Sequence, residues 1–272
     1  MYHKSGRLLC EIALKDEGTC AMKIMNNSKI NVVDVKDSHE VAARAMDIFA
    51  DLAKRAVDEK DIFHVAISGG KTPRRFYELL GTTANDSNLP WNKTELFWVD
   101  ERCVAPQSQD SNYRLANETF LKKIPISPER VHRIMGESSD YNQAVEDYDR
   151  ALRKTFNLSP RQLPQFDLMV LGMGPDGHIG SLLPNSYALF DTDDLVTVVY
   201  QLEGGLNRIT LTHPVICAAK QLLVMVSGQE KAEIVRDVLL GKPDEVKYPV
   251  HTLWPILDKV VWIIDSDAAK LL

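Results

Sequence analysis

The chain has 272 residues, of which 44% are hydrophobic and 26% are charged, and its formal net charge is −6. This composition is ordinary for a globular protein with a sizeable core, built as one large domain or two small ones. The negative charge excludes a general attraction to nucleic acid or to an anionic membrane, so an anionic ligand would need a few well-placed cations.

The N-terminal segment and the cysteines indicate a soluble cytoplasmic protein. Charged side chains occupy positions 11 and 15–17, where a signal peptide has its apolar core. No apolar stretch reaches the roughly 18 residues that a membrane span needs. The four cysteines form neither a C-x-x-C pair nor a metal-binding spacing, which suits a reducing compartment. We predict a peripheral extension at 1–30, followed by a single domain at 31–272.

From residue 31 onward, short β-branched runs alternate with segments of helical period. In the first such segment, apolar residues recur at three- and four-residue steps from Val41 to Ala56, and Asp37 or Ser38 could cap this helix. We expect strands at 32–35, 63–67, 96–99, 166–171, 195–200, 208–211, 222–226 and 260–264, and further helices at 111–122, 140–156 and 230–240. The alternation predicts an α/β fold, a mostly parallel sheet with helices on both faces.

Three of the predicted strands lead into polar, glycine-rich or ionisable turns. SGGKTP follows the strand at 63–67, DERCVAP follows the strand at 96–99, and GMGPDGH follows the strand at 166–171. In open α/β sheets, ligands bind beyond the carboxyl ends of the strands. We therefore expect these three turns to meet at one edge of the sheet and to form the functional site.

The turn SGGKTP has the features of an anion site. Gly69 and Gly70 permit a close backbone approach, Thr72 could cap the next helix, and Pro73 fits its first position. The free amides and the dipole at a helix N-terminus favour phosphate. The segment is not a Walker A motif, because Val65 stands where the first glycine of that motif belongs. The alternative is a plain glycine turn between a strand and a helix.

The charged segment from Asp100 to Arg102 follows the next strand directly. These charges could simply pair with one another. Arg102 is also well placed to give two parallel hydrogen bonds to an oxyanion or a phosphate. We interpret Cys103 as a packed small residue and not as a nucleophile.

The third turn resembles a dinucleotide fingerprint, since glycines at 172, 174 and 177 have G-x-G-x-x-G spacing. Pro184 would truncate the long helix that such a site requires, which argues against a dinucleotide. His178 is then either a structural hydrogen bonder or a general base, because imidazole titrates near neutrality and Asp176 could orient its ring. Only these two side chains cluster locally, so a metal site is not expected.

Two cations downstream could serve the same site. Arg208 opens the predicted strand at 208–211, and Lys231 lies at the start of the predicted helix at 230–240. A lysine at a helix start opposes the helix dipole, and this placement makes sense if an anion also binds there. Each residue, taken singly, could equally be a surface charge.

Five motifs in this order resemble the 6-phosphogluconolactonase family: SGGKTP, VDERCVAP with Ser111 and Asn112, LGMGPDGHIGSLLP, RITLT, and SGQEKAEIVRDVLLG. The resemblance covers roughly residues 30 to 265. It implies hydrolysis of 6-phospho-D-glucono-1,5-lactone to 6-phosphogluconate in the oxidative pentose phosphate pathway, with no metal and no cofactor. It also implies the Rossmann-like fold shared with glucosamine-6-phosphate deaminase. The partner is then a phosphorylated sugar lactone, with no nucleic acid and no membrane, and the protein a monomer or weak homo-oligomer.

The resemblance also implies roles for single residues. His178 would be the general base that activates water, Asp176 would shape its turn, and Arg102 would face the lactone or its developing oxyanion. Asp100 is a further catalytic candidate, because it could replace His178 as the base. The residues expected around the phosphate are Ser68, Gly69, Gly70, Lys71, Thr72, Arg208 and Lys231. Lys71 departs from the serine usual in the family, and Gly180 departs from the usual alanine.

Two other activities are compatible with such a scaffold. Glucosamine-6-phosphate deaminases continue DGHI with AFNEP, whose glutamate supports the histidine, and Leu183 stands at that position here. A non-catalytic sugar-phosphate sensor usually carries a helix-turn-helix segment, and residues 1–30 are too short and irregular for one. The sequence therefore favours a lactonase that releases no ammonia and binds no DNA.

Overall fold

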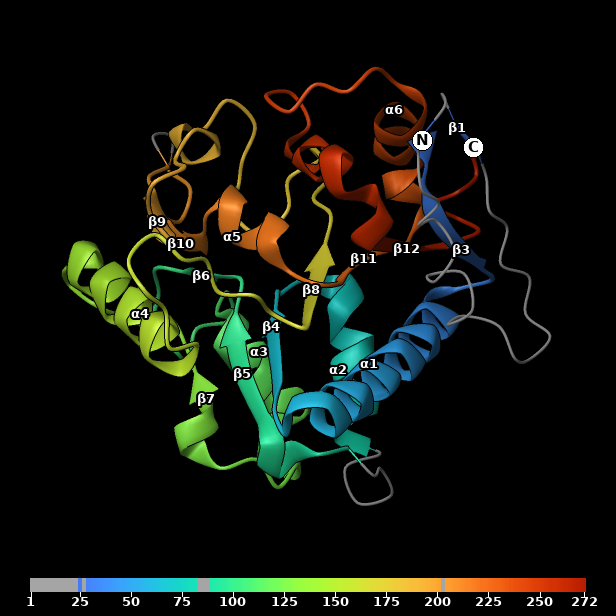
Figure 1. The fold of residues 1–272 in the computed structure, drawn as a ribbon. Coiled ribbons are helices and arrows are strands. Elements are labelled where there is room, and N and C mark those ends of the chain that lie inside the picture. The colour runs from blue at the N-terminus through green and yellow to red at the C-terminus, as the bar shows by residue number, and fades with distance from the viewer. Residues whose placement is uncertain (1–23, 26–27, 83–88, 202–203) are drawn as a thin grey trace, which may run out of the picture.

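The computed structural model describes residues 24–25, 28–82, 89–201 and 204–272, and a parallel sheet forms the centre of this part (Figure 1). Seven strands follow one another in the order β3-β12-β11-β8-β4-β5-β7, and every neighbouring pair is parallel. Their bounds are β3 Asn31–Val35, β4 Phe63–Ile67, β5 Thr94–Trp98, β7 Val131–His132, β8 Leu168–Gly172, β11 Leu222–Val226 and β12 Val260–Asp265. The predicted α/β architecture is confirmed.

A second, antiparallel sheet lies beside the first and was not predicted as a separate unit. It contains β6 (Asp100–Arg102), β10 (Arg208–Leu211) and β9 (Val196–Val199), with β10 in the middle. Residues 100–102 were predicted as a turn and are instead a strand that pairs with β10. Three residues are too few to show a periodicity, and their pairing partner lies more than a hundred residues away in the sequence. A hairpin of β1 (Ile24–Met25) and β2 (Ser28–Lys29) precedes both sheets.

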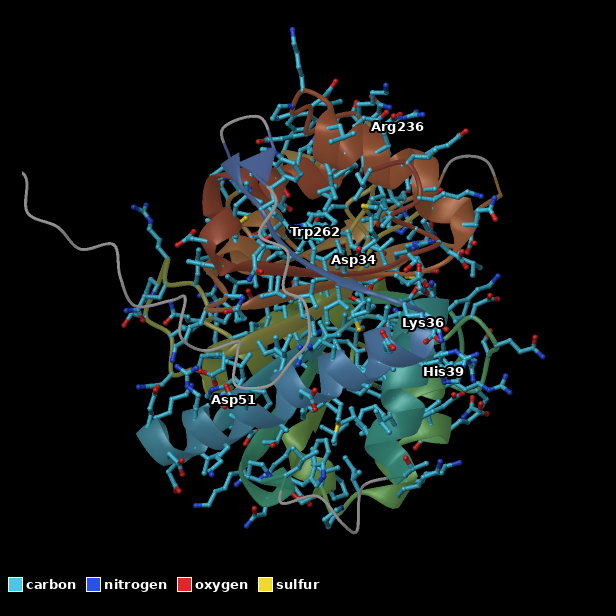
Figure 2. All side chains as sticks on the ribbon, turned by 90° about the vertical axis from the view of Figure 1, so that its right-hand side faces the viewer. Asp34, Lys36, His39, Asp51, Arg236 and Trp262 are labelled. Atoms are coloured by element: carbon cyan, nitrogen blue, oxygen red, sulfur yellow. The ribbon has the colours of Figure 1, made fainter. Side chains whose placement is uncertain are left out.

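Helices cover both faces of the central sheet. Figure 2 shows α1 (Ser38–Lys60) and α2 (Lys71–Thr82) below the sheet and α6 (Ala232–Leu240) above it. The remaining α-helices of the described residues are α3 Asn112–Thr119, α4 Tyr141–Thr155 and α5 His213–Ala218. Asp37 caps α1, because its carboxylate accepts hydrogen bonds from the backbone nitrogens of His39 and Glu40. One of the two predicted caps is thus confirmed.

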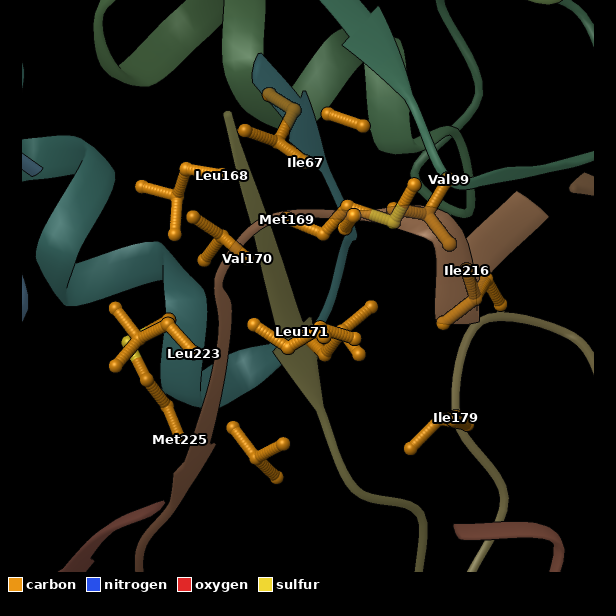
Figure 3. Close-up of a cluster of buried hydrophobic side chains, with 14 of the residues drawn as sticks. Ile67, Val99, Leu168, Met169, Val170, Leu171, Ile179, Ile216, Leu223 and Met225 are labelled. Carbon is orange, nitrogen blue, oxygen red and sulfur yellow. The ribbon is translucent and has the colours of Figure 1, made fainter. Parts of the chain in front are cut away.

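The core lies where the central strands are covered on both sides. All residues of β4 and β11 are buried, as are the first four residues of β8 (Figure 3). Such continuous apolar runs are typical of parallel strands with helices on both faces. The buried hydrophobic side chains from Ile30 to Ala268 form one cluster. The predicted division at residue 30 stays a prediction, because most of residues 1–30 lies outside the described residues.

Short elements account for most of the difference between the predicted and the observed boundaries. The six-residue α5 was not predicted, and residues 230 and 231, expected in the last helix, belong to a 3₁₀ turn at 229–231 before α6. The strands at 63–67, 208–211 and 222–226 have the predicted bounds. Within the described residues, no helix is both long and apolar enough to cross a membrane.

Candidate active site

The three predicted turns meet in a cleft of about 360 Å³ at the carboxyl ends of β4, β5 and β8. β4 lies between the other two strands, so parallel pairing alone brings the three chain segments together. The predicted site residues that line the cleft are Ser68, Gly69, Gly70, Lys71, Thr72, Asp100, Arg102, His178, Arg208 and Lys231. Asp176 does not line the cleft. Its carboxylate contacts Nδ1 of His178.

His178 and Asp176 form a close pair. His178 Nδ1 lies 2.6 Å from Asp176 Oδ1, and 21% of the histidine side chain is exposed. Burial raises the pKa of the Asp176 carboxyl, but the hydrogen bond with His178 and the charge on that ring outweigh burial, so the pKa lies below its ordinary value. An ionised carboxylate only accepts, so this hydrogen bond requires a proton on Nδ1, and in the neutral ring the lone pair then lies on Nε2. Nε2 is therefore the ring atom available as a base.

Two glycines of this turn have a steric reason within the turn itself. A Cβ on Gly174 would lie 2.2 Å from His178 Nδ1 and 2.6 Å from Asp176 Oδ1, so only glycine leaves room for the pair. Gly177 has a φ of +79°, in the left-handed region that favours glycine. No helix follows within residues 178–186, all of which are described. The expectation that Pro184 excludes a dinucleotide helix is confirmed.

Arg102 lines the cleft and forms no ion pair with a carboxylate of the described residues. Its Nη1 donates to Asn112 Oδ1 at 2.6 Å and to the Asp110 carbonyl at 2.8 Å. Its Nε is buried and has no hydrogen-bond partner among the described residues. Arg102 is half-buried and lines the cleft, so its guanidinium is suited to bind an anion that enters there. The alternative in which the charges of residues 100–102 pair with one another is not what the structure shows.

Glu101 has a structural task on the other side of this strand. Its carboxylate accepts from the backbone nitrogens of Arg102, Asn112 and Tyr113 and from Ser111 Oγ, and so it caps α3. Burial raises the pKa of Glu101, although these backbone hydrogen bonds oppose the shift. Glu101 thereby fixes the start of α3, and with it the position of Asn112.

The Ser181 hydroxyl links Asp100 and Arg208 by hydrogen bonds. Ser181 Oγ donates to Asp100 Oδ2 at 2.6 Å and accepts from Arg208 Nη1 at 3.4 Å. The Nε of Arg208 is buried and, like that of Arg102, lacks a partner among the described residues. Burial lowers the pKa of Arg208, and the charge of Asp100 opposes that shift. The antiparallel sheet thus brings a second cation to the cleft.

The glycine turn and Lys231 also line the cleft. Ser68 Oγ is buried without a described partner, and Gly70 has a φ of +119°. Lys231 Nζ donates to the Met173 carbonyl at 2.9 Å, and burial lowers the pKa of this lysine. Lys71 is exposed at the start of α2, and its charge adds to the lowering of that pKa.

The predicted cap of α2 is wrong in its position. The helix begins at Lys71, so Thr72 is its second residue and Pro73 its third. Thr72 Oγ1 lies 3.2 Å from Ser227 Oγ, in the turn before α6. Gly70 allows the helix to begin before Thr72, because its positive φ turns the chain without a side chain at the bend.

Three cleft or near-cleft residues were not predicted to have roles. Asn112 was noted only as part of a motif, and Ser181 and Glu230 were not singled out. Ser181 contacts Asp100, which lies 81 residues away in the sequence, so no local pattern marks it, and Asn112 contacts Arg102 across the loop before α3. Among the described residues, no group of three or more His, Cys, Asp or Glu side chains could hold a metal ion.

A second, larger cavity of about 540 Å³ adjoins the cleft and shares Pro175 with it. Its charged lining is mostly acidic and consists of Asp176, Glu233, Asp237, Asp244 and Lys247. The only titratable lining residue besides these is Tyr248, in the part of the chain that the structure describes. The smaller cleft, which contains the histidine and both arginines, is therefore the stronger candidate for the active site.

The family described as glucosamine-6-phosphate isomerases/6-phosphogluconolactonase matches residues 36–262. A 6-phosphogluconolactonase of Nostoc sp. is 34% identical over 242 residues, which cover 88% of this chain and 97% of the relative. The crystal structure of a 6-phosphogluconolactonase from Thermotoga maritima is 28% identical with a TM-score of 0.72, covering 86% of this chain and 98% of that one. A monomeric glucosamine-6-phosphate deaminase shares the fold, with a TM-score of 0.75 at 24% identity over 89% of this chain and 99% of that one.

Proposed function

The chain belongs to the glucosamine-6-phosphate isomerase/6-phosphogluconolactonase family, and we propose that it hydrolyses 6-phospho-D-glucono-1,5-lactone to 6-phospho-D-gluconate, a step of the oxidative pentose phosphate pathway. The observation that carries this proposal is the His178–Asp176 pair at the edge of a cleft with two arginines whose Nε atoms are unused among the described residues. A base and an anion-stabilising cation are what ester hydrolysis by water requires.

In the proposed reaction, His178 Nε2 takes a proton from water while the water oxygen forms a bond to C1 of the lactone. Arg102 stabilises the negative charge that develops on the carbonyl oxygen. The tetrahedral intermediate then collapses, the bond between C1 and the ring oxygen breaks, and the imidazolium returns the proton to that oxygen. The new carboxylic acid loses its proton to solvent. Asp176 stabilises the imidazolium and keeps its ring in place.

The phosphate lies at the other end of the proposed complex. The free amides at the start of α2, the unpartnered Ser68 hydroxyl, and the cations Arg208 and Lys231 support this assignment. Lys71 adds a further positive charge at the same end. In this proposal, contacts with the phosphate supply most of the binding energy, and the reaction takes place at the lactone ring.

Deamination of glucosamine 6-phosphate is disfavoured by one position. Leu183 stands where the deaminase pattern has its glutamate, and in this structure it packs against the hydrophobic core. A leucine cannot support a histidine by hydrogen bonding. Absence of DNA binding, a cytoplasmic location and a monomer or weak homo-oligomer stay predictions from the sequence.

The proposal is tested by two assays on one preparation: lactone hydrolysis and ammonia release from glucosamine 6-phosphate. Lactones open slowly in water, so the buffer rate is the baseline. We expect acceleration of lactone opening with EDTA present and no ammonia. A rate equal to that of buffer, with folded protein, contradicts the proposal. Ammonia without lactone hydrolysis indicates a deaminase, and tight sugar-phosphate binding with neither activity indicates a sensor.

A further inference from the structure

We infer that Asn112 is a positioning residue that holds Arg102 against the glycine turn, so that the catalytic and the phosphate ends of the cleft keep one fixed geometry. The inference rests on the proposed function, because it assigns Arg102 to the reacting carbonyl. Asn112 is the first residue of α3, lines the cleft, and is only 2% exposed. It does not itself need to touch the lactone.

Both the oxygen and the nitrogen of the Asn112 carboxamide form hydrogen bonds. Oδ1 accepts from Arg102 Nη1 at 2.6 Å, and Nδ2 donates to the Asp100 carbonyl at 2.8 Å. The backbone nitrogen of Asn112 donates to Glu101 Oε1 at 2.8 Å. Asn112 is therefore tied to three consecutive residues of β6, and Arg102 Nη1 has no other side-chain acceptor in the described part of the chain.

The same carboxamide packs against the glycine turn. A Cβ on Gly69 would lie 1.7 Å from Asn112 Oδ1 and 2.4 Å from its Cγ. The space that any other residue at 69 would need is thus filled by Asn112. The absence of a side chain at Gly69 brings the Asn112 carboxamide, and Arg102 with it, close to the phosphate turn.

An amide is the side chain that suits this position. It accepts from the guanidinium and donates to a backbone carbonyl, and it brings no charge. A carboxylate of the same shape would pair with Arg102 and neutralise the cation that the reacting oxygen needs, and it would also face the Asp100 carbonyl without a donor. The neutral contact orients Arg102 and leaves its charge for the ligand.

Two variants at this position test the inference, Asn112→Ala and the isosteric Asn112→Asp. Asn142→Ala, on the exposed first turn of α4, is the matched control. For both Asn112 variants we expect kcat to fall by about 10- to 100-fold with a much smaller change in KM, because a displaced catalytic group mainly costs transition-state stabilisation. The control should retain the wild-type kcat.

A binding readout separates positioning from general damage. 6-Phosphogluconate carries a carboxylate at C1, near Arg102 in the proposed complex, whereas glucitol 6-phosphate is neutral there. Calorimetry should show that Asn112→Ala and Asn112→Asp weaken binding of 6-phosphogluconate more than binding of glucitol 6-phosphate. Equal losses for both ligands, or wild-type kcat in the variants, would overturn the inference.

The outcomes also separate this inference from the proposed function. A wild-type protein that opens no lactone refutes the proposed function, and the ratio of the two affinities then decides the role of Asn112 alone. Asn112→Asp preserves side-chain size, so it carries the test if Asn112→Ala does not fold. The double variant Gly69→Ala/Asn112→Ala should lose little more kcat than Asn112→Ala, because the added methyl group enters the vacated space. Multiplied losses would show that Gly69 and Asn112 act independently.

Discussion

At the scale of single residues, the cleft is defined by which polar atoms have partners and which do not. His178 Nδ1 is hydrogen-bonded to Asp176, whereas the Nε atoms of Arg102 and Arg208 have no partner among the described residues. Buried donors without acceptors are costly, and they are retained where a ligand supplies the acceptor. In the proposed complex, the two arginines suit two separate anionic groups on one ligand, a phosphate and a developing oxyanion.

Arg208 and Lys231 provide the residue-scale prediction. Arg208→Ala and Lys231→Ala should each weaken binding of 6-phosphogluconate by about 1.5–3 kcal/mol, the range for a charge-assisted hydrogen bond. Unphosphorylated gluconate should bind these variants and the wild-type protein with similar affinity. Isothermal calorimetry with both ligands measures the difference.

The control is Lys242→Ala, since Lys242 is an exposed lysine just after α6. It removes the same charge from the same region and should change neither affinity. If Arg208→Ala and Lys231→Ala weakened both ligands equally, their assignment to the phosphate would be wrong.

At the scale of elements, the turn after β8 is shaped by the pair it contains. Gly174 N donates to the His178 carbonyl at 2.8 Å, and Val250 N donates to the Gly177 carbonyl at 2.9 Å. These bonds close the turn and join it to the segment before β12. Of the three glycines with dinucleotide-like spacing, Gly174 is the one whose missing side chain leaves room for His178 and Asp176.

Gly174→Ala tests this explanation. Its methyl group would lie within 2.6 Å of both His178 Nδ1 and Asp176 Oδ1, so the pair must move apart. We expect kcat to fall by about 10- to 100-fold, because even a 1 Å displacement of a catalytic group is costly. Steady-state kinetics and thermal unfolding of the variant measure activity and stability separately.

Gly172→Ala, at the last residue of β8 just before this turn, is the comparison. A Cβ there would meet Pro73 at 3.8 Å, an ordinary contact, so the loss of kcat should be far smaller. Similar losses for the two alanine variants would show that the turn tolerates no side chain at all, and that the space around His178 is not the reason.

The sequence predicted the parallel strands and the convergence of their turns, because buried β-branched runs such as Phe63–Ile67 carry a strong local signal. It could not predict β6, since Asp100–Arg102 becomes a strand only through pairing with Arg208–Thr210. The role of Asn112 was missed for the same reason. Its contacts join three segments, and no local pattern contains all of them.

At the scale of the whole molecule, the charged side chains at the two edges of the central sheet differ in whether they pair with one another. At the amino edge, away from the cleft, the Asp167 carboxylate lies 2.8 Å from Lys60 Nζ and 3.1 Å from Lys220 Nζ, and it accepts from the His64 backbone nitrogen. These charges are paired with one another. At the carboxyl edge, Arg102 and Arg208 each have a buried Nε without a partner among the described residues.

Asp167 makes stability depend on pH. Burial raises the pKa of its carboxyl, but the hydrogen bonds from His64 and Lys60 outweigh burial, and the pKa lies well below its ordinary value. A depressed folded pKa stabilises the protein above the unfolded pKa of about 3.9, and this stabilisation is lost as the pH falls further. Asp167→Asn should lower the free energy of unfolding at neutral pH by about 1–2 kcal/mol, since both lysines are partly exposed.

Urea unfolding of the wild-type protein and Asp167→Asn across pH 3–7 measures this effect. The difference between them should be largest near neutrality and should shrink below about pH 4. A difference that grew on acidification would show that the sign of the shift is wrong.

The central claim is that His178 activates water for attack on a phosphorylated lactone. The most direct test is the rate of 6-phosphogluconolactone hydrolysis by the wild-type protein and by His178→Asn, measured with EDTA present and corrected for the buffer rate. We expect the wild-type protein to accelerate opening and His178→Asn to lower kcat by about 10²–10⁴-fold with a smaller change in KM. Near wild-type turnover in folded His178→Asn would contradict the claim and move the base to Asp176 or Asp100.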